Sequence, residues 1–208
     1  MEQTINYRGY KIEIARDEFA ENPLEDESNF LGKLFTCHRK YCPQNEFKDN
    51  FEYGKVWDDD LKIRKNFTKA YYAANVYLLD HSGLTVSLSP FNNKWDSGLF
   101  GIICCLKESA KEIFDCNHSD ELLEYMVMND FKATIKCLND YYAGDVYGVR
   151  IFDDSEEEEE VDSSWGFYGD EVIPDAIEDA KCTIDKLIKL RFNIRERMNS
   201  QLQLNFNS

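Results

Sequence analysis

The sequence lacks any run of 18 apolar residues, and its first residues lack the basic-then-apolar pattern of a secretory signal peptide. A bilayer-spanning helix needs about 20 predominantly apolar residues, and a signal peptide needs an apolar segment after a basic start. Basic residues are also scarce, because 24 Lys and Arg stand against 40 Asp and Glu and give a formal net charge of -16. Nucleic acids and anionic lipids favour cationic surfaces. We therefore expect a cytoplasmic protein that binds neither a membrane nor nucleic acid directly.

The sequence also lacks a complete set of zinc ligands. It has seven cysteines, an odd number, which we expect to be free thiols in a reducing compartment. The cluster with metal-like spacing is Cys37, His38 and Cys42, whereas a structural zinc site needs four convergent ligands. We predict no cofactor and keep these three residues as an alternative metal site.

Apolar residues are numerous enough to build a core, since 43% of the chain is hydrophobic, and this excludes wholesale disorder. Strand-like patterns cluster as hairpins, and two long helical patterns accompany them. The strand patterns lie at residues 9–14, 31–41, 72–79, 85–89, 99–106, 145–152 and 161–168, and the helical patterns at 119–142 and from 175 onward. Because the strands do not alternate with helices, the sequence predicts an α+β fold. We expect a mainly antiparallel sheet of about six or seven strands with two long helices packed on one face.

Neither an internal repeat nor a long flexible linker divides the chain, so we expect a single globular domain over residues 1–208. Within it, residues 43–70 are predicted to form an irregular insertion with a short helix, and residues 199–208 a frayed tail. Ser119 is the expected N-cap of the first long helix and Gly144 its stop.

Acidic residues are concentrated in residues 151–179, which contain 13 of them and no basic residue. The centre of this segment is predicted to be the tip of a hairpin. Eight carboxylates lie there: Asp153, Asp154, Glu156, Glu157, Glu158, Glu159, Glu160 and Asp162. One interpretation is a solvated tip that contributes only solubility, as charge runs usually do. The other is a binding surface, because extended residues advance about 3.3 Å each, close to the roughly 3.4 Å between charges along one DNA strand.

The second interpretation predicts an interaction protein that docks its acidic face on a basic protein. Charge gives association rate more than affinity, so aromatic side chains are the candidate hot spots. These are Trp165 and Tyr168 beside the acidic run, and Trp57 if it is exposed.

Two stretches of the sequence are rich in motifs. The first runs from Asp80-His81-Ser82-Gly83 through Ser87-x-x-Pro90-Phe91 to Trp95-Asp96-Ser97-Gly98, and the second contains Gly144-Asp145-Val146-Tyr147-Gly148 and Ser163-x-Trp165-Gly166-Phe167-Tyr168-Gly169. In these motifs the chain resembles an uncharacterised family of bacteriophage and mobile-element proteins. Residues 43–70 and the acidic run are not part of the resemblance. The resemblance implies a phage context and no catalytic role. Together with the acidic segment it predicts an inhibitor of a basic, nucleic-acid-binding host defence protein, of the anti-restriction or anti-CRISPR type, with possible mimicry of DNA or RNA.

An enzyme is the alternative from a different class. Asp80, His81 and Asp96, joined by Asp145, offer carboxylates and an imidazole for a small metal-dependent or acid/base hydrolase acting on a nucleotide or signalling molecule. Against this, Asp, Ser and Gly are favoured at hairpin ends simply because they turn the chain. A phosphate-binding loop and a Gly-x-Ser-x-Gly motif are both missing. The sequence leaves the question of catalysis open and favours a binding protein.

Overall fold

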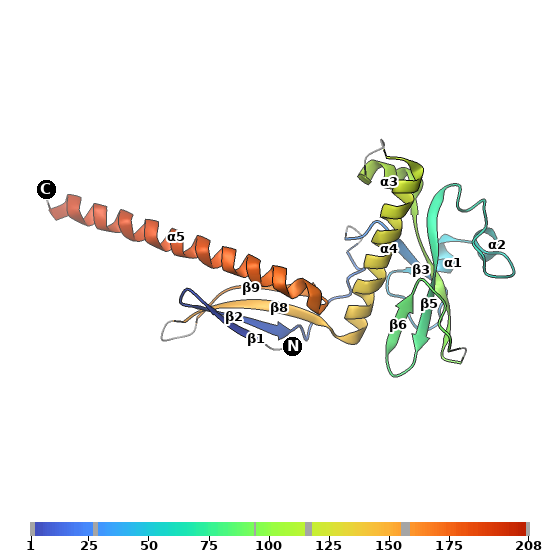
Figure 1. The fold of residues 1–208 in the computed structure, drawn as a ribbon, viewed down its shortest axis with the longest axis horizontal. Coiled ribbons are helices and arrows are strands. Elements are labelled where there is room, and N and C mark those ends of the chain that lie inside the picture. The colour runs from blue at the N-terminus through green and yellow to red at the C-terminus, as the bar shows by residue number, and fades with distance from the viewer. Residues whose placement is uncertain (1–2, 27–28, 94, 115–117, 155–158, 207–208) are drawn as a thin grey trace. The chain divides into compact units, whose positions relative to one another are not determined.

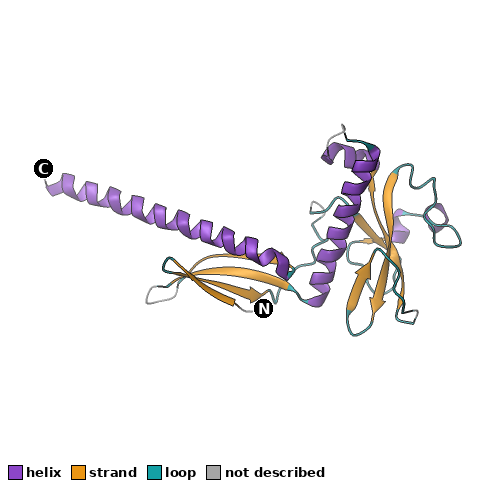
Figure 2. Ribbon diagram, viewed as in Figure 1, coloured by secondary structure: helices purple, strands orange, loops and turns teal. Residues whose placement is uncertain are grey.

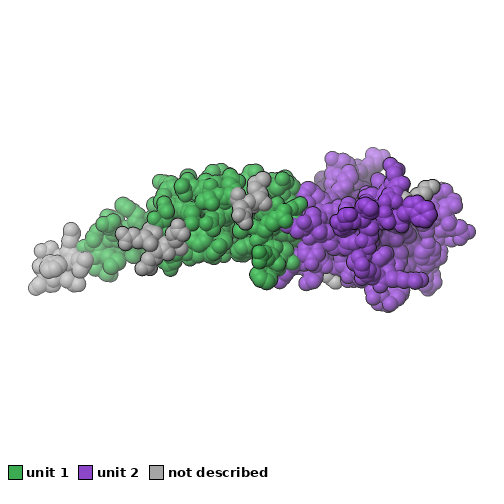
Figure 3. All heavy atoms as spheres, turned by 90° about the horizontal axis from the view of Figure 1, so that it is seen from below, with its two compact units in different colours: residues 1–20, 145–208 green, residues 21–144 purple. Residues whose placement is uncertain are grey.

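The computed structural model describes residues 3–26, 29–93, 95–114, 118–154 and 159–206 (Figure 1). Contacts within the chain group it into two compact units, one made of residues 1–20 and 145–208 and the other of residues 21–144 (Figure 3). Each unit has its own sheet and its own core. That the whole chain makes a single domain stays a prediction.

The first unit is a four-stranded antiparallel sheet with one face covered by a helix (Figure 1). Its strands, in spatial order, are β1 (Gln3–Tyr7), β2 (Tyr10–Arg16), β8 (Val146–Asp153) and β9 (Glu160–Tyr168). A short 3-10 turn, η1 (Asp170–Val172), leads into α5 (Ile173–Phe206). Alternate side chains of β2 and β8 point to one face, where they pack on Ala176, Ala180 and Ile184 of α5.

The second unit has a five-stranded sheet with a long helix beside it (Figure 2). The other side of the sheet packs on a cluster of aromatic side chains that includes Phe47, Trp57 and Phe67, called the aromatic cluster below. Its strands are β3 (Lys33–Thr36), β4 (Asn45–Glu46), β5 (Tyr71–Asp80), β6 (Leu84–Ser87) and β7 (Ser97–Leu106), in spatial order β4-β3-β7-β5-β6. Its helices are α1 (Phe47–Asn50), α2 (Tyr53–Val56), α3 (Lys107–Phe114) and α4 (Asp120–Ala143). One side of β7 packs on α4 through Ile103 and Cys105, and the other side packs on the aromatic cluster through Ile102 and Cys104.

The α+β class is confirmed, but the single sheet is wrong. The chain leaves the first sheet after β2 and returns to it at β8, and these two strands are antiparallel neighbours with Arg16 opposite Tyr147. The two longest helices, α4 and α5, therefore pack on different sheets and not on one common face. Hydrophobic periodicity reports which residues form strands, but it does not report which strand pairs with which.

The predicted N-cap and the predicted end of α4 are confirmed. The Ser119 hydroxyl accepts a hydrogen bond from the Leu122 amide at 3.3 Å, which satisfies one of the helix's first donors. The helix ends at Gly144, whose φ of 70° lies in the left-handed region that glycine adopts without strain.

Residues 43–70 contain two short helices, α1 and α2, joined by turns, as the sequence predicted. They also contribute to a core, because the Trp57 side chain is completely buried and its indole N–H donates to Asn75 Oδ1 at 2.7 Å. Trp57 is therefore no surface hot spot. The predicted frayed tail is instead helical as far as Phe206, as part of α5. After Pro174 the sequence contains neither glycine nor proline to end that helix.

None of the helices in the described part of the chain combines the length and the apolar composition that a bilayer crossing requires.

Candidate functional site

Trp165 lies on edge strand β9 with its ring against the backbone of Gly148 in β8. A Cβ built at Gly148 would overlap the ring, so the absence of a side chain is what permits this contact. The strand register shifts at this point, between Tyr147 and Val149, as in a β-bulge. The Trp165 side chain keeps 49% of its surface exposed. A ring already held in place loses little conformational freedom when a partner covers it, which favours a binding role.

The acidic run is fixed at both ends by the β8–β9 hairpin. The strands pair as far as Phe152 opposite Glu160, and the Asp153 amide donates to the Glu159 carbonyl at 2.8 Å. The predicted position of this run between two paired strands is confirmed. Glu156, Glu157 and Glu158 lie outside the described residues.

Two of the carboxylates assigned to partner binding are held in ion pairs within the unit. Arg191 of α5 donates to Asp153 Oδ2 at 2.5 Å, and Arg150 Nε donates to Glu160 Oε2 at 2.8 Å. The hydrogen bond from Arg150 lowers the pKa of Glu160 below its ordinary value. These two acids hold the hairpin and α5 in place, so they are poorer candidates for a partner's charges than the sequence suggested.

The remaining described carboxylates of the run, Asp154, Glu159 and Asp162, are exposed. Asp162 also lines a cavity of about 90 Å³ between β9 and α5, together with Asp179. Tyr168 ends the same strand and is half-buried. Exposed carboxylates therefore lie on the strand that carries Trp165 and on the helix beside it.

Long charged side chains cover part of the sheet face opposite α5. The Lys11 ammonium lies 5.0 Å and the Arg150 guanidinium 4.6 Å from the centre of the Phe152 ring, which is buried beneath them. Glu13 lies between these bases, 3.2 Å from Lys11 Nζ. This face therefore carries bases and acids side by side, and the Trp165 ring lies on it as well, because Gly148 shares the face of Arg150 and Phe152.

Three of the four residues proposed for catalysis meet in the second unit, where β5 ends and β7 begins. The Asp80 amide donates to the Asp96 carbonyl at 2.8 Å, and His81 Nδ1 lies 3.1 Å from Asp96 Oδ2. Both aspartates line a polar pocket of about 400 Å³ with His38 and Trp95. Asp145 belongs to the other unit, where it accepts a hydrogen bond from Arg16 at 2.9 Å.

The carboxylates of this pocket already have hydrogen-bond donors from the protein. Tyr41 Oη donates to Asp80 at 3.2 Å, and Asn93 Nδ2 donates to Asp96 at 2.9 Å. Ser82, with φ 56°, belongs to the turn between β5 and β6. The turn expected at residues 80–83 is present, and a paired imidazole and carboxylate lie beside it.

Cys37, His38 and Cys42 do not form a metal site. The Cys37 thiol donates to the Phe100 carbonyl at 3.4 Å, and the His38 ring stacks on Tyr41 with centroids 5.2 Å apart. His38 Nδ1 accepts from the amides of Lys40 and Tyr41. Over the whole described part of the chain, no three His, Cys, Asp or Glu side chains are grouped to hold a metal ion, and no disulfide links the six described cysteines.

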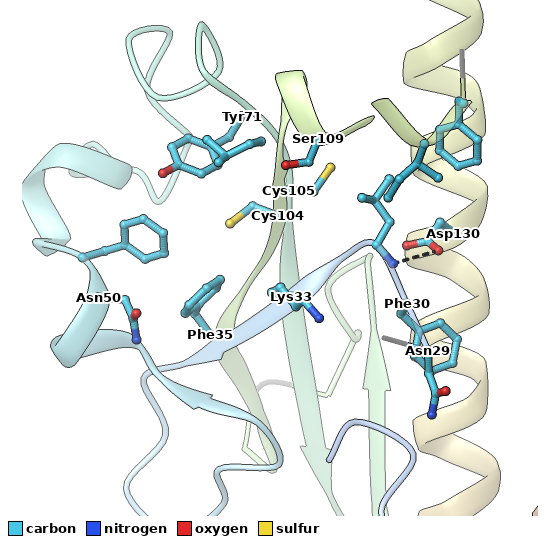
Figure 4. A pocket seen from close by; sticks show the side chains of 15 residues that line it. Asn29, Phe30, Lys33, Phe35, Asn50, Tyr71, Cys104, Cys105, Ser109 and Asp130 are labelled. Atoms are coloured by element: carbon cyan, nitrogen blue, oxygen red, sulfur yellow. Dashed lines mark hydrogen bonds between the residues drawn. The ribbon is translucent and has the colours of Figure 1, made fainter. Parts of the chain in front are cut away.

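The sequence did not predict a pocket of about 730 Å³ in the second unit (Figure 4). Phe35, Phe51 and Tyr71 are among its lining residues, together with Cys104 and Cys105, whose side chains lie on opposite faces of β7. Burial raises the pKa of each thiol to about 12, so neither is a ready nucleophile. These residues are scattered in the sequence, and only strand pairing brings them together.

Comparisons with models of protein families, with curated proteins and with solved structures gave no match. The resemblance to phage proteins therefore stays a prediction.

Proposed function

We propose that this chain is a binding protein that docks β9 and the adjoining acidic surface on a cationic partner protein. The observation that carries the proposal is Trp165, half exposed and seated on Gly148 within an acidic segment that contains no base. Fixed aromatic rings surrounded by polar groups are the usual anchors of protein interfaces.

The charge pattern supports a cationic partner rather than a neutral one. Like charges held together repel one another, and screening over about 8–10 Å at physiological ionic strength softens this without removing it. A cationic partner relieves that repulsion when it binds. The negative potential of the acidic surface also steers such a partner toward the site. The internal ion pairs of Asp153 and Glu160 leave Asp154, Glu159 and Asp162 as the described carboxylates that meet the partner.

A nucleic-acid-binding defence protein of the host is the sharper form of the proposal. It rests on the resemblance to phage proteins and on the match between strand rise and phosphate spacing. In this form the protein acts in the host cytoplasm and competes with nucleic acid for a basic groove.

Fluorescence anisotropy with a labelled arginine-rich peptide tests the proposal with a defined cationic probe. We expect Trp165→Ala to weaken binding by about tenfold or more, as for a hot-spot residue. The matched control is Phe19→Ala, because Phe19 is an exposed aromatic of the same unit outside the acidic segment. Equal loss in both variants, or loss in neither, would contradict the proposal.

Acid/base chemistry at His81 is a second candidate, supported by the 3.1 Å contact between His81 Nδ1 and Asp96. A carboxylate on one ring nitrogen orients an imidazole for proton transfer at the other. Calorimetric titration with Mg²⁺, Mn²⁺ or Zn²⁺ tests the metal-dependent form. Heat that is lost in Asp96→Asn would favour it, and no heat with any of the three ions would count against it.

A further inference from the structure

The two features of the proposed binding site lie on opposite faces of β9. Asp162 pairs with Ile151, whose side chain packs toward α5, so Asp162 lies on the α5 face of the sheet. Trp165 contacts Gly148 instead. Gly148 is three residues before Ile151 in β8, and this odd interval places it on the opposite face. A partner that contacts Asp162 and Trp165 together must therefore reach both faces of the sheet.

The outer edge of β9 lies between these two faces. β9 ends the spatial order of its sheet, and its residues 162–166 are exposed. Sheet edges often carry lysine or proline, which discourage an added strand, and Glu160–Tyr168 contains neither. Bulges limit how far an added strand can pair, and two register shifts leave residues 162–164 as the continuous stretch between them. An added segment can pair with the backbone there and reach the rest of the site through its side chains.

The α5 side of this edge is acidic on both elements that form it. Asp179 of α5 and Asp162 of β9 line the same cavity of about 90 Å³, and both are exposed. The nearest base in line with Asp179 along α5 is Lys186, about two turns further along the helix. A partner at this edge therefore meets carboxylates on one side and the Trp165 ring on the other.

We infer that the part of the partner that binds is an extended basic segment, which lies along the outer edge of β9. This inference rests on the proposed function. Successive side chains of an extended chain point to opposite sides. The bases of the segment therefore reach Asp162 and Asp179 on one side, while the residues between them cover Trp165 on the other. A flat protein surface on either face would contact only one of the two features. A second copy of β9 is a poorer occupant, because it would bring two acidic strands together.

Fluorescence anisotropy with the labelled arginine-rich peptide tests docking at the edge. We expect Trp165→Ala and Asp179→Asn each to weaken binding, Asp179→Asn by about threefold, as for an exposed charge pair. The matched control for Asp179 is Glu178→Gln, which removes a charge on the other side of α5, where Glu178 pairs with Lys181 beside β1. The control for the face of Trp165 is Glu13→Gln, because Glu13 lies on that face two strands away from β9. Both controls should bind the peptide as the wild type does.

The outcomes separate this inference from the proposed function. If the wild type does not bind the peptide, or if Trp165→Ala binds it equally well, both are wrong. If Trp165→Ala weakens binding but Asp179→Asn does not, the partner lies on one face and docking at the edge is wrong. Equal weakening by Asp179→Asn and Glu178→Gln, or weakening by Glu13→Gln, would also overturn the edge position.

Backbone methylation of the peptide tests whether the bound segment is extended. A strand added at an edge presents backbone N–H groups to the sheet at every second residue. A peptide N-methylated at alternate residues keeps one unmodified side and should bind like the parent peptide. Methylation at every residue should weaken binding by about fivefold or more, because hydrogen bonds to β9 are lost. Equal binding of the fully methylated and unmodified peptides would overturn the addition of a strand.

Discussion

The indole ring of Trp165 lies directly on the backbone of Gly148, one strand away. Glycine leaves the ring a bare surface to rest on, and the edge position of β9 leaves the ring's other side open. This contact supports the proposed function, because the packing that fixes the Trp165 ring also leaves its other side exposed to a partner.

Gly148→Ala should displace the Trp165 ring. The added methyl group occupies the space of the ring, and overpacking of this kind costs about 1–3 kcal/mol. Urea unfolding of Gly148→Ala, Trp165→Ala and the double variant measures the coupling between them. We expect the cost of the alanine at Gly148 to disappear once Trp165 is removed. Additive costs would contradict the proposed contact.

Glu160→Gln should alter the pH dependence of stability. Arg150 lowers the pKa of Glu160 in the folded protein, so the ionised carboxylate stabilises the fold above its ordinary pKa of about 4.3. That contribution is lost as the pH falls through the lowered pKa. Because the pair is partly exposed, we expect less than about 1 kcal/mol. The difference in unfolding free energy between wild type and variant should be present at neutral pH and vanish in acid; a difference that grows in acid would reverse the assignment.

Asn75→Ala should destabilise the second unit. It leaves the indole N–H of the buried Trp57 without its acceptor and the Leu61 carbonyl without the Asn75 donor. Leaving a buried donor without a hydrogen-bond acceptor costs about 1–3 kcal/mol of folding free energy. The matched comparison is made in a Trp57→Phe background, which has no indole N–H, and there the same substitution should cost less. An equal cost in both backgrounds would show that the indole hydrogen bond contributes nothing.

The first unit should fold without residues 18–144. Strands β2 and β8 are paired neighbours, and the Asp17 amide donates to the Val146 carbonyl at 2.8 Å. An Asn-Gly linker between Asp17 and Asp145 can therefore close a short hairpin. We expect cooperative thermal unfolding and dispersed amide signals by NMR from the shortened chain. A collapsed, non-cooperative product would show that this unit depends on the other for its stability.

Local chemistry made several elements predictable from the sequence. Ser119 and Gly144 mark the ends of α4 because capping depends on residues within one turn. The β5–β6 hairpin and the β8–β9 pair follow from alternation and turn residues that lie close together in the chain.

The wrong predictions concern contacts between distant segments. No local signal pairs Arg16 with Tyr147 across the intervening unit. Trp57 precedes three aspartates, and the sequence leaves its exposure open; Asn75, eighteen residues on, provides the partner that allows its burial. For the candidate site, composition identified the acidic run and Trp165, but the ion pairs that occupy Asp153 and Glu160 depend on Arg191 and Arg150, which only the folded arrangement brings near.

The salt dependence of partner binding tests the central claim most directly. Binding of the arginine-rich peptide is measured over a series of salt concentrations for the wild type and for the triple variant Asp154→Asn, Glu159→Gln, Asp162→Asn. The acidic surface predicts weaker binding and a shallower salt slope for the variant, because fewer charges are neutralised on association. Identical affinity and slope in the two proteins would contradict the proposed cationic partner.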